Sequence, residues 1–122
     1  MNDTNAPHLL LGLIELDKAG TVLYSRLDKN GARPDINGQN FFSEVAPFNN
    51  VEDFRQLIDT FTQGPTQAHC LSFICEFNDC RVPVRVLLAR ICERSLPERP
   101  TKSILIHIRE AWAGATAGLQ RA

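Results

Sequence analysis

The sequence predicts an α+β domain that combines antiparallel strands with a few helical segments. Residues 12–25 show a hairpin pattern, and residues 51–62 show a single amphipathic helical pattern. Three alternating apolar stretches follow, at residues 68–78, 80–91 and 103–110. This order, with strands at both ends of the chain and helices between them, is typical of an α+β protein rather than of a repeating β–α fold.

Length and charge restrict the function classes. A chain of 122 residues is long enough for one domain with a single core. The 13 basic and 14 acidic residues give a net charge of −1, whereas nucleic-acid or anionic-membrane binding needs a basic excess. The apolar run at residues 9–13 is too short for a membrane span and lacks the basic segment of a signal peptide. We therefore expect a cytoplasmic protein that binds neither nucleic acid nor membrane directly.

The first part of the chain predicts a leader and a hairpin. Residues 1–8 are polar and are expected to form a flexible leader before a domain at residues 9–110. Ile14 and Leu16 lie on one side of the first strand, and the turn at residues 18–20 leads into a second strand at residues 21–25. Residues 26–36 are polar and rich in breakers, which predicts a loop.

Residues 36–48 hold the most distinctive pattern of the chain. Asn37-Gly38 is a turn dipeptide, and Asn40 is placed to cap a short helix that begins with Phe41 and Phe42. Pro47 prevents this helix from continuing, so a single turn anchored by aromatic side chains is expected.

One longer helix is predicted next. Residues 51–62 carry apolar side chains at helical spacing, Asn49 and Asn50 are candidate caps, and Gly64-Pro65 ends the pattern. The apolar positions are Val51, Phe54, Leu57, Ile58 and Phe61.

The next two strands are predicted to pair in one register. A two-residue turn at Asn78-Asp79 places Cys75 opposite Val82 and Phe73 opposite Val84, so two apolar faces coincide. The last strand, at residues 103–110, has isoleucines on one side and Leu105 with His107 on the other. Residues 111–122 are expected to form a tail or a short helix, and the prolines before residue 103 predict a loop.

The run from Gly38 to Pro47 resembles the PAS superfamily, and specifically the photoactive yellow protein type. The matching positions are Gly38, Asn40, Phe41, Phe42, Val45, Ala46 and Pro47, and the hairpin also begins as many PAS domains do. The resemblance implies a five-stranded antiparallel sheet with helices packed on one face and the last strand in the centre beside the first.

The resemblance also implies a change in chemistry. In that family the residue after Ala-Pro is the cysteine that forms a thioester with a coumaryl chromophore, and Phe48 stands at that position here. Ser25 stands at the site of a chromophore-binding tyrosine, and Lys29 lies near the site of a glutamate. Without the nucleophile, no yellow photocycle is expected.

The candidate pocket is the interior under the helices. Phenylalanines are expected to fill it, although a small apolar ligand or cofactor bound non-covalently remains the alternative. The expected lining residues are Ile14, Leu16, Leu23, Ser25, Phe41, Phe42, Phe48, Phe61, Phe73 and Ile106.

No cofactor, metal site or catalytic site is predicted. His69 and His107 are the strand histidines to consider for haem, but the first begins its strand and the second alternates with inward isoleucines. Cys70, Cys75, Cys80 and Cys92 lack the spacing of a zinc site or a secreted disulfide framework, which indicates reduced thiols. The sequence has no nucleophile elbow and no phosphate-binding loop, so an enzyme is not expected.

The expected working surface is the outer face of the sheet together with the apolar leader. Several apolar residues have no evident place in the core, and such patches usually mark interfaces. We expect them to bind a second copy or a regulatory protein partner, unless the leader folds back over the sheet. These residues are Leu9, Leu10, Leu11, Ile74, Leu87, Leu105 and Trp112.

Overall fold

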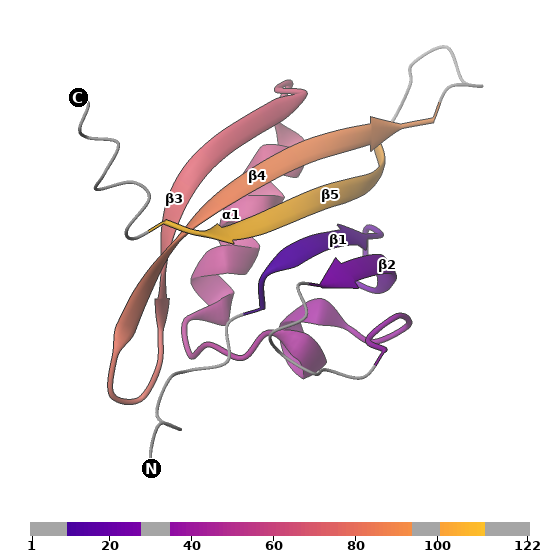
Figure 1. The fold of residues 1–122 in the computed structure, drawn as a ribbon. Coiled ribbons are helices and arrows are strands. Elements are labelled where there is room, and N and C mark those ends of the chain that lie inside the picture. Colours follow the sequence, from indigo (N-terminus) through magenta and orange to yellow (C-terminus); the bar gives the residue numbers. More distant parts are fainter. Residues whose placement is uncertain (1–9, 28–34, 94–100, 112–122) are drawn as a thin grey trace.

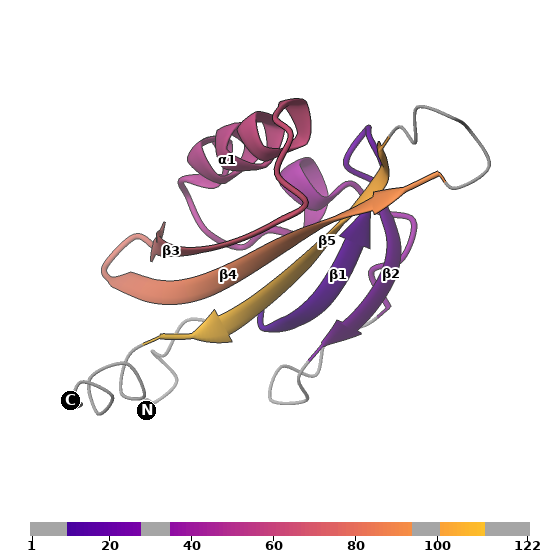
Figure 2. The same ribbon diagram turned by 90° about the horizontal axis from the view of Figure 1, so that it is seen from above.

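The computed structural model describes residues 10–27, 35–93 and 101–111, and these form an antiparallel sheet with helices on one face (Figure 1). Seen from above in Figure 2, helix α1 (Val51–Gln63) and the single-turn π-helix η2 (Phe41–Val45) lie on the same side of the sheet. The predicted α+β fold is therefore confirmed. The expected leader, the tail after residue 111 and the central parts of the two predicted loops lie outside the described residues.

The sheet has five strands in the order β2-β1-β5-β4-β3. Strand β5 lies between β1 and β4, which confirms the central position implied by the family resemblance. Strands β2 and β3 form the two edges. The strands are β1 (Gly12–Leu16), β2 (Val22–Leu27), β3 (Ala68–Glu76), β4 (Arg81–Cys92) and β5 (Thr101–Glu110).

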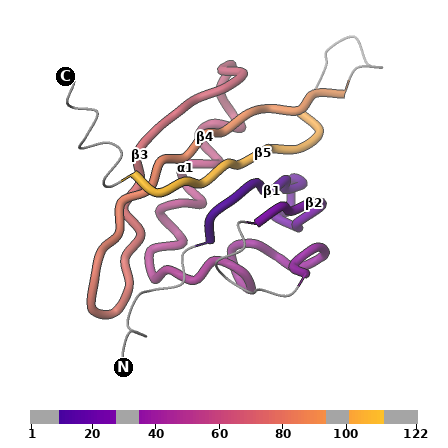
Figure 3. The backbone as a smooth tube through the Cα atoms, viewed as in Figure 1, coloured from indigo at the N-terminus to yellow at the C-terminus, as the bar shows by residue number. Residues whose placement is uncertain are grey.

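The β3–β4 hairpin pairs in the predicted register. Cys75 lies opposite Val82 and Phe73 opposite Val84, and the Phe77 N–H donates to the Cys80 carbonyl at 2.8 Å to close the turn. The hairpin extends past the end of β5, because the β5 pairing begins only at Val84, as the backbone trace in Figure 3 shows. Alternation of apolar and polar side chains was sufficient to fix this register, since a slip of one residue would expose the apolar face.

A tight turn joins β1 to β2 and supports η2. The Asp17 carboxylate accepts hydrogen bonds from the Ala19 and Thr21 N–H groups, both at 2.9 Å. Gly20 has φ +92°, and a Cβ there would lie 2.9 Å from the ring of Phe42. Glycine is therefore required both by the backbone conformation and by the close approach of the ring.

Asn50 fixes the start of α1 to the edge strand β3. Its side chain donates to the Ile74 carbonyl at 2.8 Å and accepts from the Glu76 N–H at 3.0 Å, while the Asn49 N–H donates to the Glu76 carbonyl at 2.7 Å. These bonds satisfy backbone groups that an edge strand would otherwise expose. The helix therefore begins at a fixed position over the sheet.

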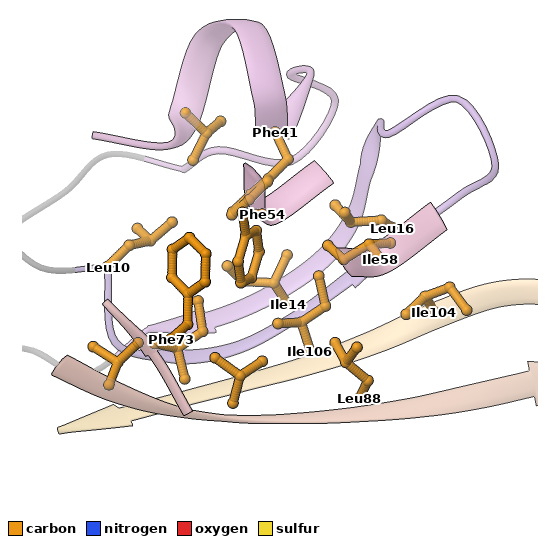
Figure 4. Packing of buried hydrophobic residues seen from close by; sticks show 14 of the residues in the cluster. Leu10, Ile14, Leu16, Phe41, Phe54, Ile58, Phe73, Leu88, Ile104 and Ile106 are labelled. Carbon is orange, nitrogen blue, oxygen red and sulfur yellow. The ribbon is translucent and has the colours of Figure 1, made fainter. Parts of the chain in front are cut away.

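The core lies between the helices and the inner face of the sheet, as the close-up in Figure 4 shows. Ile14 on β1, Ile106 on β5 and Phe41 on η2 are fully buried there. Burial of apolar side chains contributes roughly 25 cal/mol for each Å² removed from water, so this layer is the main source of stability. Within the described residues, no helix is long and apolar enough to cross a membrane.

Candidate functional site

The interior site is built around η2, as the sequence predicted. The Asn40 side chain accepts hydrogen bonds from the Phe42 and Ser43 N–H groups, both at 3.0 Å. In return, the Glu44 carboxylate accepts from the Asn40 N–H at 2.7 Å, which is the reciprocal pattern of a capping box. This short helix therefore holds Phe41 in a fixed, fully buried position over the sheet.

Four buried phenylalanines form one cluster of ring contacts in this interior, and the half-buried Phe42 joins it through Phe41. Phe54 on α1 contacts Phe41, Phe48 and Phe73, with ring centroids 5.8, 5.7 and 5.0 Å apart. Phe48 also lies 5.8 Å from Phe73. Such tilted and edge-on pairs each stabilise by about 0.5–1.5 kcal/mol beyond the buried area. Phe48 is 5% exposed and part of this cluster.

Most of the predicted pocket residues come together in this interior. Phe42 is half-buried and packs against the edge of the core, with its ring 5.3 Å from that of Phe41. The buried members are Ile14, Leu16, Phe41, Phe48, Phe61, Phe73 and Ile106.

One pocket prediction on β2 needs correction. Leu23 is 46% exposed, and Val22 occupies the interior instead. The reason is an irregularity between Glu15 and Leu16, which pairs Leu16 with Val22 and changes the side of the sheet that each β2 residue faces. Ser25 is half-buried and donates to the Asn37 side chain at 3.0 Å, so it does not take part in the aromatic cluster. Lys29 lies outside the described residues.

The sequence reasoning also left out residues that complete the interior. Phe54 is at the centre of the aromatic cluster. Its spacing of four residues from Ile58 was the signal that both lie on the face of α1 that packs against the sheet. Ile36 is 1% exposed although it follows a polar loop, and no periodic pattern predicted this.

One hollow opens beside the interior, between the β1–β2 turn and α1. It has a volume of about 190 Å³, and its floor includes Leu16, Phe42 and Ile58. Asp17, Asp59 and Thr62 contribute polar groups to its lining. A small molecule could lie in this hollow, or in a second hollow of about 360 Å³ whose lining includes Phe61, Leu71 and Leu88.

The outer face of the sheet, which the helices leave uncovered, forms the second candidate site (Figure 2). Ile74 and Leu87 are 47% and 41% exposed there, and Leu105 is half-buried. A shallow hollow of about 360 Å³ crosses the face, lined by Leu13, Leu87, Leu105 and their neighbours. Apolar side chains are thus present on the outer face, as predicted.

The leader residues behave differently from the prediction. Leu10 and Leu11 are 3% and 8% exposed and belong to the core, so they have no part in an exposed surface. They enter the core just before β1. Leu10, Leu11 and Gly12 are consecutive and all buried, so an alternating pattern could not predict their burial. Leu9 and Trp112 lie outside the described residues.

The described residues offer no grouping of metal ligands. Among them, no three His, Cys, Asp or Glu side chains come together in a way that could hold an ion. His69 is exposed at the start of β3, on the helical side of the sheet opposite Leu88, and His107 is half-buried on the outer face, so the two histidines lie on opposite faces. All four cysteines are free thiols, and burial raises the pKa of Cys75 to about 12.

Comparison with known proteins supports the fold. No protein-family model matches the chain, and no curated protein matches it in sequence. Among solved structures, the chain is similar to the photoactive yellow protein domain from the sensor histidine kinase Ppr of Rhodospirillum centenum, with a TM-score of 0.52 and 25% sequence identity. The match covers 84% of this chain and 92% of that domain. The chain therefore has the α+β fold of a photoactive yellow protein-like PAS domain.

Proposed function

We propose that the chain is a non-photoactive PAS module of bacterial-type signal transduction or regulation, which acts through the outer face of its sheet. The similar domain from Rhodospirillum centenum is part of a sensor histidine kinase, which supports a role in sensory signalling. The observation that carries the proposal is the contrast between an interior closed by aromatic rings and an outer face with exposed apolar residues. We expect the protein to act in the cytoplasm, without catalytic activity of its own.

The absence of photochemistry follows from Phe48. A buried phenyl ring cannot form a thioester, and it occupies volume that a coumaryl group would need. Incubation with activated coumaric acid should leave the protein colourless, without the visible absorption of a chromophore held in the interior. Appearance of a visible absorption band together with the mass of one coumaryl group would contradict the proposal. Hydroxylamine treatment is the control, because it releases a thioester but not a non-covalent ligand.

The outer face should support a dimer or the docking of a regulatory partner. Burial of exposed leucine and isoleucine side chains under a second protein favours association. A charged side chain placed among them would oppose association, because the charge would lose its hydration. If the outer face pairs with a second copy, light scattering at micromolar concentration should show a dimer that Ile74→Glu or Leu105→Glu shifts toward monomer with unchanged circular dichroism. If it docks a regulatory partner, the same two variants should weaken binding of that partner. Leu23→Glu is the matched control, since Leu23 is equally exposed but outside the apolar outer-face set.

A monomer at all concentrations would favour partner docking over self-association. If neither variant then changes binding to any partner captured with the wild-type protein, the outer face has no role and the proposal fails.

A second candidate function is a sensor that binds a small apolar ligand without a covalent bond. The hollow of about 190 Å³ between the β1–β2 turn and α1 favours it, because its apolar floor and polar rim suit a small amphipathic molecule. Native mass spectrometry of protein purified from its own source separates the two candidates. A retained small molecule supports the sensor, and its loss on Ile58→Trp would place it in this hollow.

A further inference from the structure

Basic side chains frame the apolar outer face. Arg85 on β4 and Arg109 on β5 lie directly opposite each other in the sheet, and Arg26 lies on the edge strand β2 opposite Leu13. His107 lies between them, opposite both Leu13 and Leu87. Like charges placed directly opposite each other destabilise a sheet, so this arrangement has a cost for the isolated domain.

These arginines have no acidic partner in the part of the chain that the structure describes. The ion pairs there are Arg55 with Glu52 and Arg81 with Glu76, at 3.7 and 3.4 Å. Glu15 also lies on the outer side of β1, where its carboxylate accepts a hydrogen bond of 2.6 Å from Ser103, and its negative charge offsets one of the three arginines. The outer face therefore has a basic surplus although the whole chain has a net charge of −1.

Two connected hollows lie between the arginines. The first is the outer-face hollow of about 360 Å³, whose lining includes Arg26, Leu13 and Leu105. The second has a volume of about 130 Å³ and is lined by Cys70, Arg85, Leu87, His107 and Arg109. They share Leu87 and His107, so apolar and basic groups form one continuous surface.

We infer that this surface binds an acidic amphipathic segment of a partner protein, with apolar side chains on the leucines and carboxylates on Arg85, Arg109 and Arg26. The inference rests on the proposed docking role of the outer face and names the chemistry of the partner. Charge complementarity of this kind directs a partner to its site and sets its register.

The register of the sheet sets the spacing of the partner's carboxylates. Arg26 and Arg85 are three strand spacings and two residues apart, which corresponds to about 16 Å. An α-helix covers that distance in about three turns, or roughly 11 residues. The best-fitting segment is therefore a helix with apolar residues at core spacing and acidic residues about three turns apart.

Two other occupants fit the surface less well. In a two-fold dimer the same patch faces its own copy, which would bring the uncompensated arginines of both chains to one interface. A nucleic acid would find leucines rather than stacking aromatic rings at the centre of the surface. An acidic peptide satisfies both the arginines and the leucines.

The test uses the full chain and a fluorescent 18-residue peptide with leucines at helical spacing and glutamates three turns apart. A matched peptide carries lysines in place of the glutamates. Fluorescence anisotropy should show binding of the acidic peptide only, weakening as salt rises. The double variant Arg85→Gln, Arg109→Gln should bind about tenfold more weakly, since two exposed ion pairs are lost. Lys102→Gln is the control, because Lys102 is exposed on the same strand but lines neither outer-face hollow.

Alkylation of Cys70 gives an independent readout of the location. Its exposed thiol lies 4.0 Å from the Arg85 guanidinium, so a bound peptide should slow its reaction with iodoacetamide. The rate at Cys80, in the β3–β4 turn, should not change.

Several results would overturn the inference. Equal binding of the two peptides, unchanged affinity of the double variant, or no protection of Cys70 would each do so. Preferential binding of a single-stranded oligonucleotide would assign the basic surplus to a nucleic acid instead. A further outcome is that the double variant abolishes a dimer while the wild-type dimer fails to bind the acidic peptide. A second copy of the chain then occupies the outer face. In that case the inferred partner chemistry is wrong, while the proposed function of the outer face stands.

Discussion

The thiol of Cys75 is buried at 3% exposure on the inner face of β3, and this changes its acid–base behaviour. Burial raises its pKa from 9.0 to about 12, because the thiolate would lose its hydration. Below pH 9 the thiol is protonated in both the folded and the unfolded chain, so its full contribution to stability is present. Between pH 9 and 12 only the unfolded chain loses the proton, and stability falls.

We therefore expect the free energy of unfolding to fall over this window by up to about 1.4 kcal/mol per pH unit from Cys75 alone. Urea unfolding at about pH 8 and about pH 10.5 measures the change, and Cys75→Ala removes the contribution of this thiol. The difference between the wild type and the variant should therefore shrink as pH rises. An equal pH dependence of both proteins would show that Cys75 ionises in the folded state as it does in solvent.

Asn50 has a position that the sequence predicts and hydrogen-bond partners that it does not predict. The sequence predicted a cap, and the residue does precede α1, but its side chain makes no hydrogen bond to the helix. It bonds instead to Ile74 and Glu76, 24 and 26 residues later in the chain. A local pattern reports only on local backbone groups, so a side chain used across the fold is not predictable from its neighbours.

At the scale of the elements, one side chain from the sheet, Arg90 on β4, binds the carbonyl groups at the C-terminal end of α1. The Arg90 guanidinium donates to the carbonyls of Phe61 and Thr62 at 2.8 and 2.9 Å. It also donates to the carbonyls of Gly64 and Thr66, and it lies over the Phe61 ring at 5.3 Å from the centroid. A cation at this position interacts favourably with the negative end of the helix dipole.

Arg90→Met should lower the free energy of unfolding by about 2–3 kcal/mol, since several carbonyls lose a charged donor together. Arg90→Lys should recover only part of the loss, because an ammonium lacks the planar fork that reaches separate carbonyls. Urea unfolding measures both variants, and hydrogen exchange should show faster opening at residues 60–64 than in the rest of α1. Full recovery by lysine would show that charge alone, without the geometry of the fork, ends the helix.

The strands were predictable to different degrees, for physical reasons. Both faces of the β3–β4 pair alternate, so only one register places Phe73 opposite Val84 with its apolar face inward. The prediction that Leu23 on β2 faces the interior was wrong. The pairing of β1 with β2 contains an irregularity, and the alternation of so short a strand does not reveal it. The interior site was therefore predicted where helices and long strands build it, at Phe41, Phe48 and Ile106, and missed at the edge.

At the scale of the whole molecule, the two sides of the sheet differ in charge. The two helices carry four acidic residues, Glu44, Glu52, Asp53 and Asp59, against the single arginine Arg55, whereas the outer face has a surplus of arginine. The near-zero net charge of the chain conceals this separation, and composition alone argued only against acidic partners such as nucleic acids and anionic membranes. Only the register of the sheet brings residues 26, 85 and 109 to one surface.

The interior of the molecule is filled by its own rings, and this has a testable consequence for ligand binding. Phe48→Ala should lower the free energy of unfolding by about 3–5 kcal/mol and leave a cavity among Phe41, Phe54 and Phe73. A dry apolar cavity of that kind binds benzene, and binding to the native state alone raises the melting temperature. We therefore expect benzene to stabilise Phe48→Ala and to leave the wild type and the exposed-site control Leu23→Ala unchanged. If benzene raises the melting temperature of the wild type as much as that of Phe48→Ala, the native interior already has room for a ligand. Sensing of a small apolar molecule then becomes the better account of this fold than docking at its outer face.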